Sequence, residues 1–181
     1  MPYPSLRPHL APATLAIGLT FGSALGHQAS AQWSQATDHQ ATELARAKEA
    51  YNQQRYALAL HAFETWIDRA DQTESNDFVD ASYHAAMSAL ALYHKDAVVR
   101  VKGFMDDFPE SPLALQAHWE LANYHYKRKN FSRASEEFMG IRIRDLAKPK
   151  RDELRFKLGH CLFEREEFEK ARVYLYDVLD V

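Results

Sequence analysis

The fold is decided by the stretch WELANYHYKRKNFSRASEEF, residues 119–138. Its apolar residues fall three and four positions apart, which is the spacing of an amphipathic helix and not of an alternating strand. A polar break at residues 127–130 divides the stretch, so it predicts two helices joined by a tight turn. From Thr42 onward the same spacing continues, and no segment has the pattern of a strand.

This pair of helices recurs along the chain. The alanines that mark it are Ala59, Ala97, Ala134 and Ala171, which lie 38, 37 and 37 residues apart. A period this constant indicates an internal repeat. In each unit a small residue stands in the preceding helix and a bulky residue follows the alanine by four positions, so that paired helices can approach closely and interlock. The small residues are Ala47, Ala85, Ala122 and Gly159, and the bulky ones are Phe63, Val101, Phe138 and Leu175.

The repeat resembles the tetratricopeptide repeat family, and most closely its members in the bacterial cell envelope. The third unit carries the resemblance best, because Phe108-Pro109-Glu110-Ser111-Pro112 leads into the stretch 119–138. The fourth unit carries it in Phe156-Lys157-Leu158-Gly159-His160, Phe163, Phe168 and Ala171. The first two units depart from the family pattern, since Arg46 replaces an aliphatic residue and His94 replaces an aromatic one.

The resemblance covers residues 42–181 and implies an all-α protein, a right-handed α-solenoid of about four helix-turn-helix repeats. The expected units are 42–73, 76–110, 112–147 and 149–181. The expected helices span 38–53, 55–70, 76–93, 95–108, 112–128, 130–145, 149–165 and 167 to the end. Boundary signals agree with these spans, because Ser111 followed by Pro112 is typical of a helix start and Pro149 can begin the next unit.

Residues 1–31 have the features of a secretory signal peptide. Arg7 gives a positive start, residues 10–25 are apolar and small, and Ala29-Ser30-Ala31 fits a cleavage site that would leave Gln32 first. The apolar stretch is too short and too interrupted to predict a membrane-spanning helix. With a short linker at 32–41, the sequence predicts an exported protein, in the periplasm or at the periplasmic face of the outer membrane of a Gram-negative bacterium. The alternative is a tail of similar composition on a cytoplasmic adaptor.

Composition excludes some classes of function. The chain of 181 residues is 46% hydrophobic and 26% charged, which fits a folded protein with a sizeable core. A formal net charge of -3 gives no basic excess for neutralising phosphates, so a dedicated nucleic-acid binder is not expected. The single cysteine, Cys161, excludes an intramolecular disulfide, and its apolar helical surroundings predict a small buried side chain.

No motif predicts an enzyme. The sequence has no Gly-x-Ser-x-Gly, no phosphate-binding glycine loop and no dinucleotide fingerprint, so we expect no catalytic residue and no cofactor. Paired carboxylates for glycoside cleavage stay open, because they meet in space and not in sequence. Nine histidines occur, but no His-Glu-x-x-His and no cysteine pair accompany them, so no metal site is expected either.

The resemblance also implies a binding surface, because the first helices of tetratricopeptide repeats line a concave groove. Trp119, Asn123 and Tyr126 share one helix face, and such an aromatic and amide stripe can hold a peptide. The alternative is that these aromatic residues only pack between repeats. The residues expected in the groove are Tyr51, Trp119, Asn123, Tyr126, Phe156, His160 and Phe163, with Lys48, Asn52, Lys127 and Glu164 at its polar edge.

A basic run lies between Lys127 and Lys157, with eleven lysines and arginines against five acids. It could dock an acidic partner or anionic lipid headgroups, in peripheral contact with a membrane. The alternative is a solvated face whose charges complement helix ends.

The sequence therefore predicts a non-catalytic scaffold or adaptor of the bacterial envelope that binds peptide segments or envelope proteins through its groove. The final helix shows no polar cap, which predicts the N-terminal part of a longer array or an end that packs against another chain. A second hypothesis follows from this: a helical adaptor within a larger enzyme or secretion component whose active domain lies beyond residue 181.

Overall fold

The computed structural model of the protein describes residues 39–70, 72–73 and 75–179, and these residues form helices and connecting turns with no strand. The expected all-α class is confirmed. Residues 39–52 are helical. The further helices are α2 (Tyr56–Arg69), α3 (Asn76–Ala91), α4 (Ala97–Asp107), α5 (Pro112–Lys127), α6 (Phe131–Gly140), α7 (Lys148–Glu164) and α8 (Phe168–Leu179), with a short 3-10 helix, η1, at Ile143–Asp145.

The N-terminal expectations fall largely outside this range. The predicted signal peptide at 1–31 lies outside the described residues. Of the predicted linker at 32–41, residues 39–41 are described, and they are helical. The Trp66 indole Nε1 of α2 donates a hydrogen bond to the Gln40 carbonyl oxygen at 3.0 Å, which ties this first turn to the next helix. Residues 39–41 therefore belong to the helical array.

Side-chain caps set several helix starts. The Ser111 hydroxyl accepts from the Leu113 amide at 3.2 Å, and Pro112 occupies the first helical position, as the sequence predicted. Ser75 caps α3 by accepting from the Phe78 amide at 3.2 Å. These bonds satisfy amide groups that have no partner inside the helix.

One helix is shorter than predicted. The sequence predicted a helix over 130–145, but α6 ends at Gly140, and Ile141 is extended with φ -82° and ψ 122°. The chain leaves the helix here because Ile141 and Leu146 turn inward, with 4% and 8% of their surfaces exposed, into the core that contains Leu154 and Leu158 of α7. Burial of these two residues outweighs continuation of the helix.

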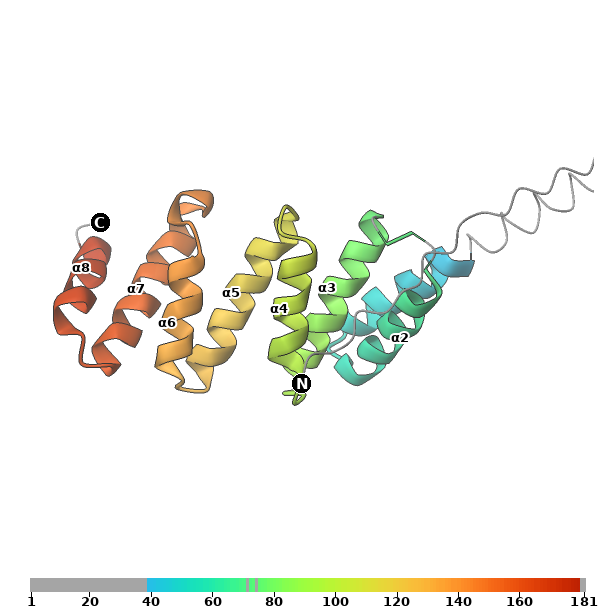
Figure 1. Cartoon of the computed structure of the whole chain (residues 1–181), viewed down its shortest axis with the longest axis horizontal. Helices are drawn as coiled ribbons and strands as arrows, with labels where there is room; N and C mark the ends of the chain where they lie inside the picture. The colour runs from blue at the N-terminus through green and yellow to red at the C-terminus, as the bar shows by residue number, and fades with distance from the viewer. Residues whose placement is uncertain (1–38, 71, 74, 180–181) are drawn as a thin grey trace, which may run out of the picture. The chain divides into compact units, whose positions relative to one another are not determined.

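The helices pack in chain order (Figure 1). Each helix from α2 to α8 contacts the next, and α3 also contacts α5. Helix α5 is the shared layer, because Ala117 and Leu121 join the core made with α3 and α4, whereas Trp119 and Ala122 join the core made with α6 and α7. Both faces of α5 are thus buried, and it connects the two halves of the array.

The predicted interlocking of small and bulky residues is present within the pairs. Ala59, Ala97, Ala134 and Ala171 are at most 1% exposed. Phe63, Val101 and Phe138 are fully buried in the same cores as the small residues Ala47, Ala85 and Ala122. In the fourth pair the contact is direct, because a Cβ built on Gly159 would lie 2.7 Å from the Leu175 Cγ. The second helix therefore occupies the space that a larger residue would need.

The turns inside the pairs also repeat. Among the described residues, the non-glycine positions with positive φ are Gln54 (58°), Tyr93 (55°), Lys129 (57°) and Glu166 (62°), one in each pair. After each, the next amide bonds back five residues, as from Asn130 to His125 at 2.9 Å and from Glu167 to Leu162 at 2.9 Å. This is the Schellman arrangement, which usually contains glycine. All four residues are non-glycine and so carry some backbone strain.

We predict opposite effects for two glycine substitutions. Gly103→Ala, where an added Cβ meets nothing within 4 Å, should stabilise the protein by up to about 1 kcal/mol because alanine favours the helix. Gly159→Ala should destabilise it by roughly 1–3 kcal/mol because α7 and α8 must separate. Urea denaturation measures both. Equal stabilisation by the two variants would contradict the interlocked packing.

We also predict that glycine at a turn stabilises the fold. Lys129→Gly should raise the free energy of unfolding by roughly 0.5–1 kcal/mol because it relieves the left-handed conformation. The matched control is Glu136→Gly in the interior of α6, which should cost about 1 kcal/mol. Thermal melting of both variants is the measurement, and a loss of stability in Lys129→Gly would count against this turn geometry.

Candidate functional site

The first helices of the first three pairs share a pocket of about 230 Å³. It lies among the 39–52 helix, α3 and α5, with the turn after α3 at its edge. Five of its lining side chains are tyrosines, and we call it the tyrosine pocket. Its lining residues are Tyr51, Tyr56, Tyr83, Met87, Leu90, Ala91, Tyr93, Gln116, Glu120, Asn123, Tyr124 and Lys127.

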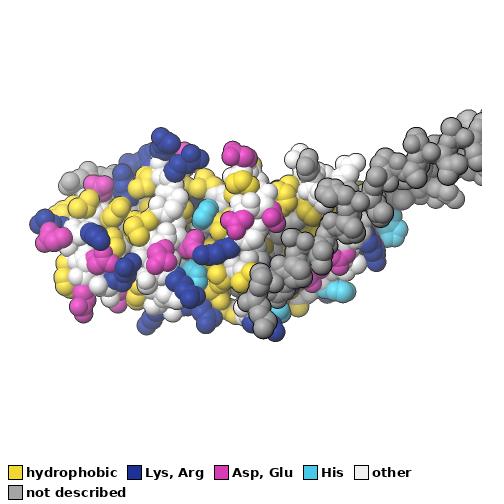
Figure 2. Space-filling model, viewed as in Figure 1, with side chains coloured by type: hydrophobic (Ala, Val, Ile, Leu, Met, Phe, Trp, Pro, Cys, Tyr) yellow, Lys and Arg dark blue, Asp and Glu magenta, His cyan; other side chains and the backbone are white. Residues whose placement is uncertain are grey.

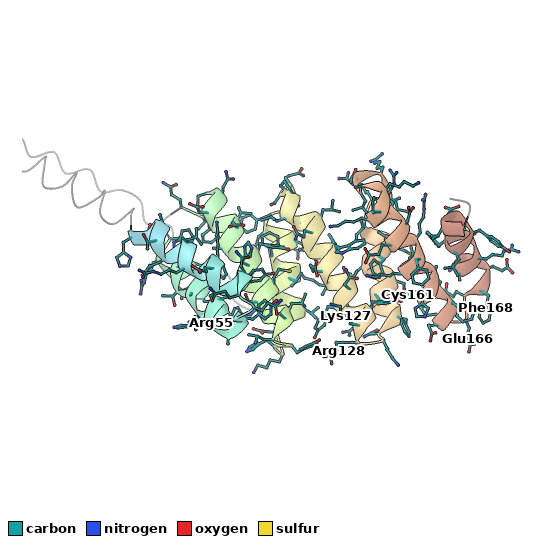
Figure 3. The ribbon with its side chains drawn as sticks, turned by 180° about the vertical axis from the view of Figure 1, so that it is seen from behind. Arg55, Lys127, Arg128, Cys161, Glu166 and Phe168 are labelled. Atoms are coloured by element: carbon teal, nitrogen blue, oxygen red, sulfur yellow. The ribbon has the colours of Figure 1, made fainter. Side chains whose placement is uncertain are left out.

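The tyrosines are held by contacts between helices. Tyr51 meets the Tyr56 ring edge to face, with centroids 5.5 Å apart. Tyr93 and Tyr124 lie 5.7 Å apart, and the Arg128 guanidinium carbon lies 5.7 Å and 5.5 Å from their centroids. Lys127 and Arg128 stand together at the end of α5 (Figure 3). One side of the pocket is therefore braced by a cation against two aromatic rings.

A polar network lies beside Tyr51, outside the residues that line the pocket. Lys48 Nζ of the first helix pairs with Asp80 Oδ2 of α3 at 2.5 Å. His84 Nδ1 donates to the Asp80 carbonyl oxygen at 2.8 Å. The His84 ring then stacks on Phe63 at 5.5 Å and meets Tyr51 edge to face at 4.7 Å. The Lys48–Asp80 ion pair therefore connects the 39–52 helix to α3.

Burial sets the ionisation of two pocket hydroxyls. It raises the pKa of Tyr51, with smaller contributions from Tyr56 and Glu120. It also raises the pKa of Tyr83, where Tyr51 and then Glu120 add to the effect. Both hydroxyls therefore stay protonated at neutral pH. Among the described residues, neither hydroxyl has a hydrogen-bond partner, and the Glu120 carboxylate has neither a hydrogen bond nor an ion pair.

Two residues expected in the groove, Trp119 and Asn123, are buried on α5, and of these two Asn123 lines the tyrosine pocket. Trp119 is 6% exposed and meets Phe138 at 6.0 Å, with Lys157 Nζ at 5.6 Å from its ring. Asn123 is 7% exposed, its Nδ2 donates to the Trp119 carbonyl at 2.9 Å, and its Oδ1 accepts from Lys157 Nζ at 2.6 Å. Trp119 is buried because α7 covers it, as the alternative of packing between repeats supposed.

Tyr126 of α5 and Phe156, His160 and Phe163 of α7, which were also expected in the groove, lie elsewhere, with Phe168 of α8 beside Phe163. The Tyr126 hydroxyl and His160 Nδ1 are 3.0 Å apart. The rings of His160 and Phe156 stack at 6.4 Å, and Phe163 meets Phe168 at 5.3 Å. Phe156 and Phe163 are 52% and 53% exposed. These side chains are at a different place from the tyrosine pocket, so the expected groove residues divide into two sets.

The tyrosine pocket contains three of the eleven predicted binding residues, namely Tyr51, Asn123 and Lys127. Asn52 and Glu164 are exposed and outside it. The prediction missed Tyr56, Tyr83, Tyr93, Glu120 and Tyr124. A signal for two of them existed, because Tyr83 and Glu120 each stand two residues before the small residue of their helix. Equivalent positions in a repeat face the same side.

Cys161 is fully buried, and burial raises the pKa of its thiol to about 11, which confirms the small buried side chain predicted. Within residues 39–70, 72–73 and 75–179 no cluster of His, Cys, Asp and Glu could hold a metal ion. In the same residues, no helix is long and apolar enough to cross a membrane.

The basic run is partly paired. Arg142 meets Asp145 at 2.7 Å, and Lys157 meets Glu153 at 2.5 Å. On the face shown in Figure 2, basic and acidic side chains are mixed, with a basic group at one end of α6 and α7. Docking of an acidic partner or of lipid headgroups there stays a prediction.

Comparison with known proteins adds no family. No protein-family model matches the chain, and no curated protein matches it either.

The two positions 119 and 156 are equivalent in the repeat but differ in burial, which gives a matched pair of variants. Trp119→Ala should destabilise the protein by about 3–5 kcal/mol because it opens a cavity in the core. Phe156→Ala should cost no more than about 1 kcal/mol because its ring is half exposed. Urea denaturation compares them. If Trp119→Ala lowers the free energy of unfolding no more than Phe156→Ala does, the tryptophan lies on the surface and not in the core.

Proposed function

We propose that the protein is a non-catalytic scaffold of the tetratricopeptide repeat type that holds a segment of a partner protein in the tyrosine pocket. The observation that carries this is a pocket lined by five tyrosines in which two hydroxyls and a carboxylate lack partners among the described residues. Tyrosine combines a large apolar ring with a polar tip and is common where proteins meet partners.

The size of the pocket supports a peptide and not a cofactor. Its volume of about 230 Å³ is below the range of roughly 300–1,000 Å³ typical of sites that enclose small molecules. Such a space fits one side chain of a longer segment. Tyr93, which is 59% exposed, and Lys127 at the rim would contact the rest of that segment.

The repeat type and location are parts of the same proposal. The period near 37 residues, the interlocked small and bulky residues and the repeated turns support a tetratricopeptide-like solenoid. The signal-like residues 1–31 support export to the periplasm.

A second candidate function, a helical adaptor in a larger enzyme or secretion component, is favoured by the surface of α7 and α8. Phe156 and Phe163 are repeat equivalents of Trp119 and Tyr126, which α7 contacts. Phe156 and Phe163 are more than half exposed, as are Phe168 and Tyr176 beside them. The aromatic surface of α5 is covered by α7, whereas the equivalent surface of α7 is open. This open surface is suited to bind a further helix.

Site-specific photocrosslinking in the producing cell tests the first proposal. A photoreactive residue replaces Tyr93 at the pocket or, as a control, Val99 of α4, which is 65% exposed and does not line the pocket. We expect a discrete crosslinked protein from position 93 and none from position 99. Crosslinks of equal yield from both positions, or from neither, would contradict a partner-binding pocket.

A further inference from the structure

We propose that the tyrosine pocket selects a basic side chain, lysine or arginine, on an extended segment of its partner. This inference rests on the proposed function and adds the chemical class of the group that is bound. It follows from three polar groups that line one small space: the Glu120 carboxylate and the hydroxyls of Tyr51 and Tyr83.

None of these three groups accepts a hydrogen bond from another described residue. Glu120 has no ion pair or hydrogen bond among the described residues, and its side chain is partly buried. Tyr83 is 3% exposed, yet its hydroxyl has no hydrogen-bond partner in the same residues. The Tyr83 hydroxyl oxygen is not one of the fully buried atoms that lack a hydrogen-bond partner, which in the described residues are Ser88 Oγ and His118 Nδ1, so it is open to the pocket. A ligand that supplies donors can therefore bond to it and to Glu120. An ammonium group carries three donors and a guanidinium five, and neither accepts.

The charges around the pocket favour the same ligand. Glu120 is the only acid among the lining residues, and it lies near enough to Tyr51 and Tyr83 to raise the pKa of each hydroxyl. A carboxylate from a partner would be repelled by Glu120, whereas a cation would be attracted. Arg128 already lies against the rings of Tyr93 and Tyr124, so the tyrosine rings that can add to this attraction are those of Tyr51, Tyr56 and Tyr83.

The basic side chains near the pocket do not neutralise Glu120, so the preference for a basic ligand remains. Lys127, the one basic lining residue, stands two helical turns from Glu120 and is exposed at the rim, where water screens it. Lys157 occupies the position on α7 that is equivalent to Glu120 on α5, but it pairs with Glu153 and Asn123. Lys48 forms an ion pair with Asp80. None of these forms an ion pair with Glu120.

The test is an NMR titration of the full chain with capped peptides Gly-Ala-Xaa-Ala-Gly, in which Xaa is arginine, lysine, glutamine or glutamate. We expect the arginine and lysine peptides to shift the resonances of Tyr83 and Glu120 and to bind about tenfold more tightly than the glutamine peptide, with the glutamate peptide weakest. Glu120→Gln should lower the affinity for the arginine and lysine peptides about tenfold. The matched control Glu110→Gln, an exposed acid outside the pocket, should leave it unchanged.

Tyr83→Phe keeps the ring and so the fold, and it should weaken the arginine peptide by roughly threefold because one acceptor is lost. If all four peptides shift the pocket equally, or if Glu120→Gln binds as the parent does, the basic specificity is overturned and the binding pocket stands. If no peptide shifts the pocket while crosslinking at position 93 succeeds, the basic specificity alone fails. If both fail, the proposed function fails as well.

Discussion

The close approach of two helices within each pair is the constraint on which the rest of the structure depends. A small residue in the first helix leaves room for a bulky residue in the second, as at Gly159 and Leu175, where an added Cβ would lie 2.7 Å from the Leu175 Cγ. Because the same contact repeats, equivalent positions of the first helices face the same side. Tyr83 of α3 and Glu120 of α5 belong to no sequence motif. They line one pocket because they occupy equivalent positions of neighbouring first helices.

Much of the fold could be predicted from the sequence, because its determinants are local. The spacing of apolar residues gives the helices, the recurring alanines give the pairs, and Ser111 before Pro112 gives a helix start that the structure confirms. The early end of α6 could not be predicted, since Gly140 alone does not require it. It depends on the burial of Ile141 and Leu146 against α7, which is a contact between distant residues.

The candidate site was predicted less well, for a related reason. Trp119 lies on the helix face expected to line the groove, but whether a residue there is open depends on the neighbouring helix, and Lys157 of α7 lies over the Trp119 ring. Tyr83 carried no motif, and its importance appears only when the first helices are placed side by side. Repeat register gives the side on which a residue lies, whereas the depth of its burial is set by the size of the side chains on the next pair.

If a partner covers the tyrosine pocket, the tyrosines at its edge are protected, and tyrosine footprinting measures this directly. Tyr93 at the pocket and Tyr176 of α8 are each 59% exposed, so hydroxyl radicals should modify them equally in the purified protein. In the producing cell, we expect Tyr93 to be protected and Tyr176 to be modified as before. Equal modification of both in the cell would contradict the account, and protection of Tyr176 alone would favour docking at α7 and α8.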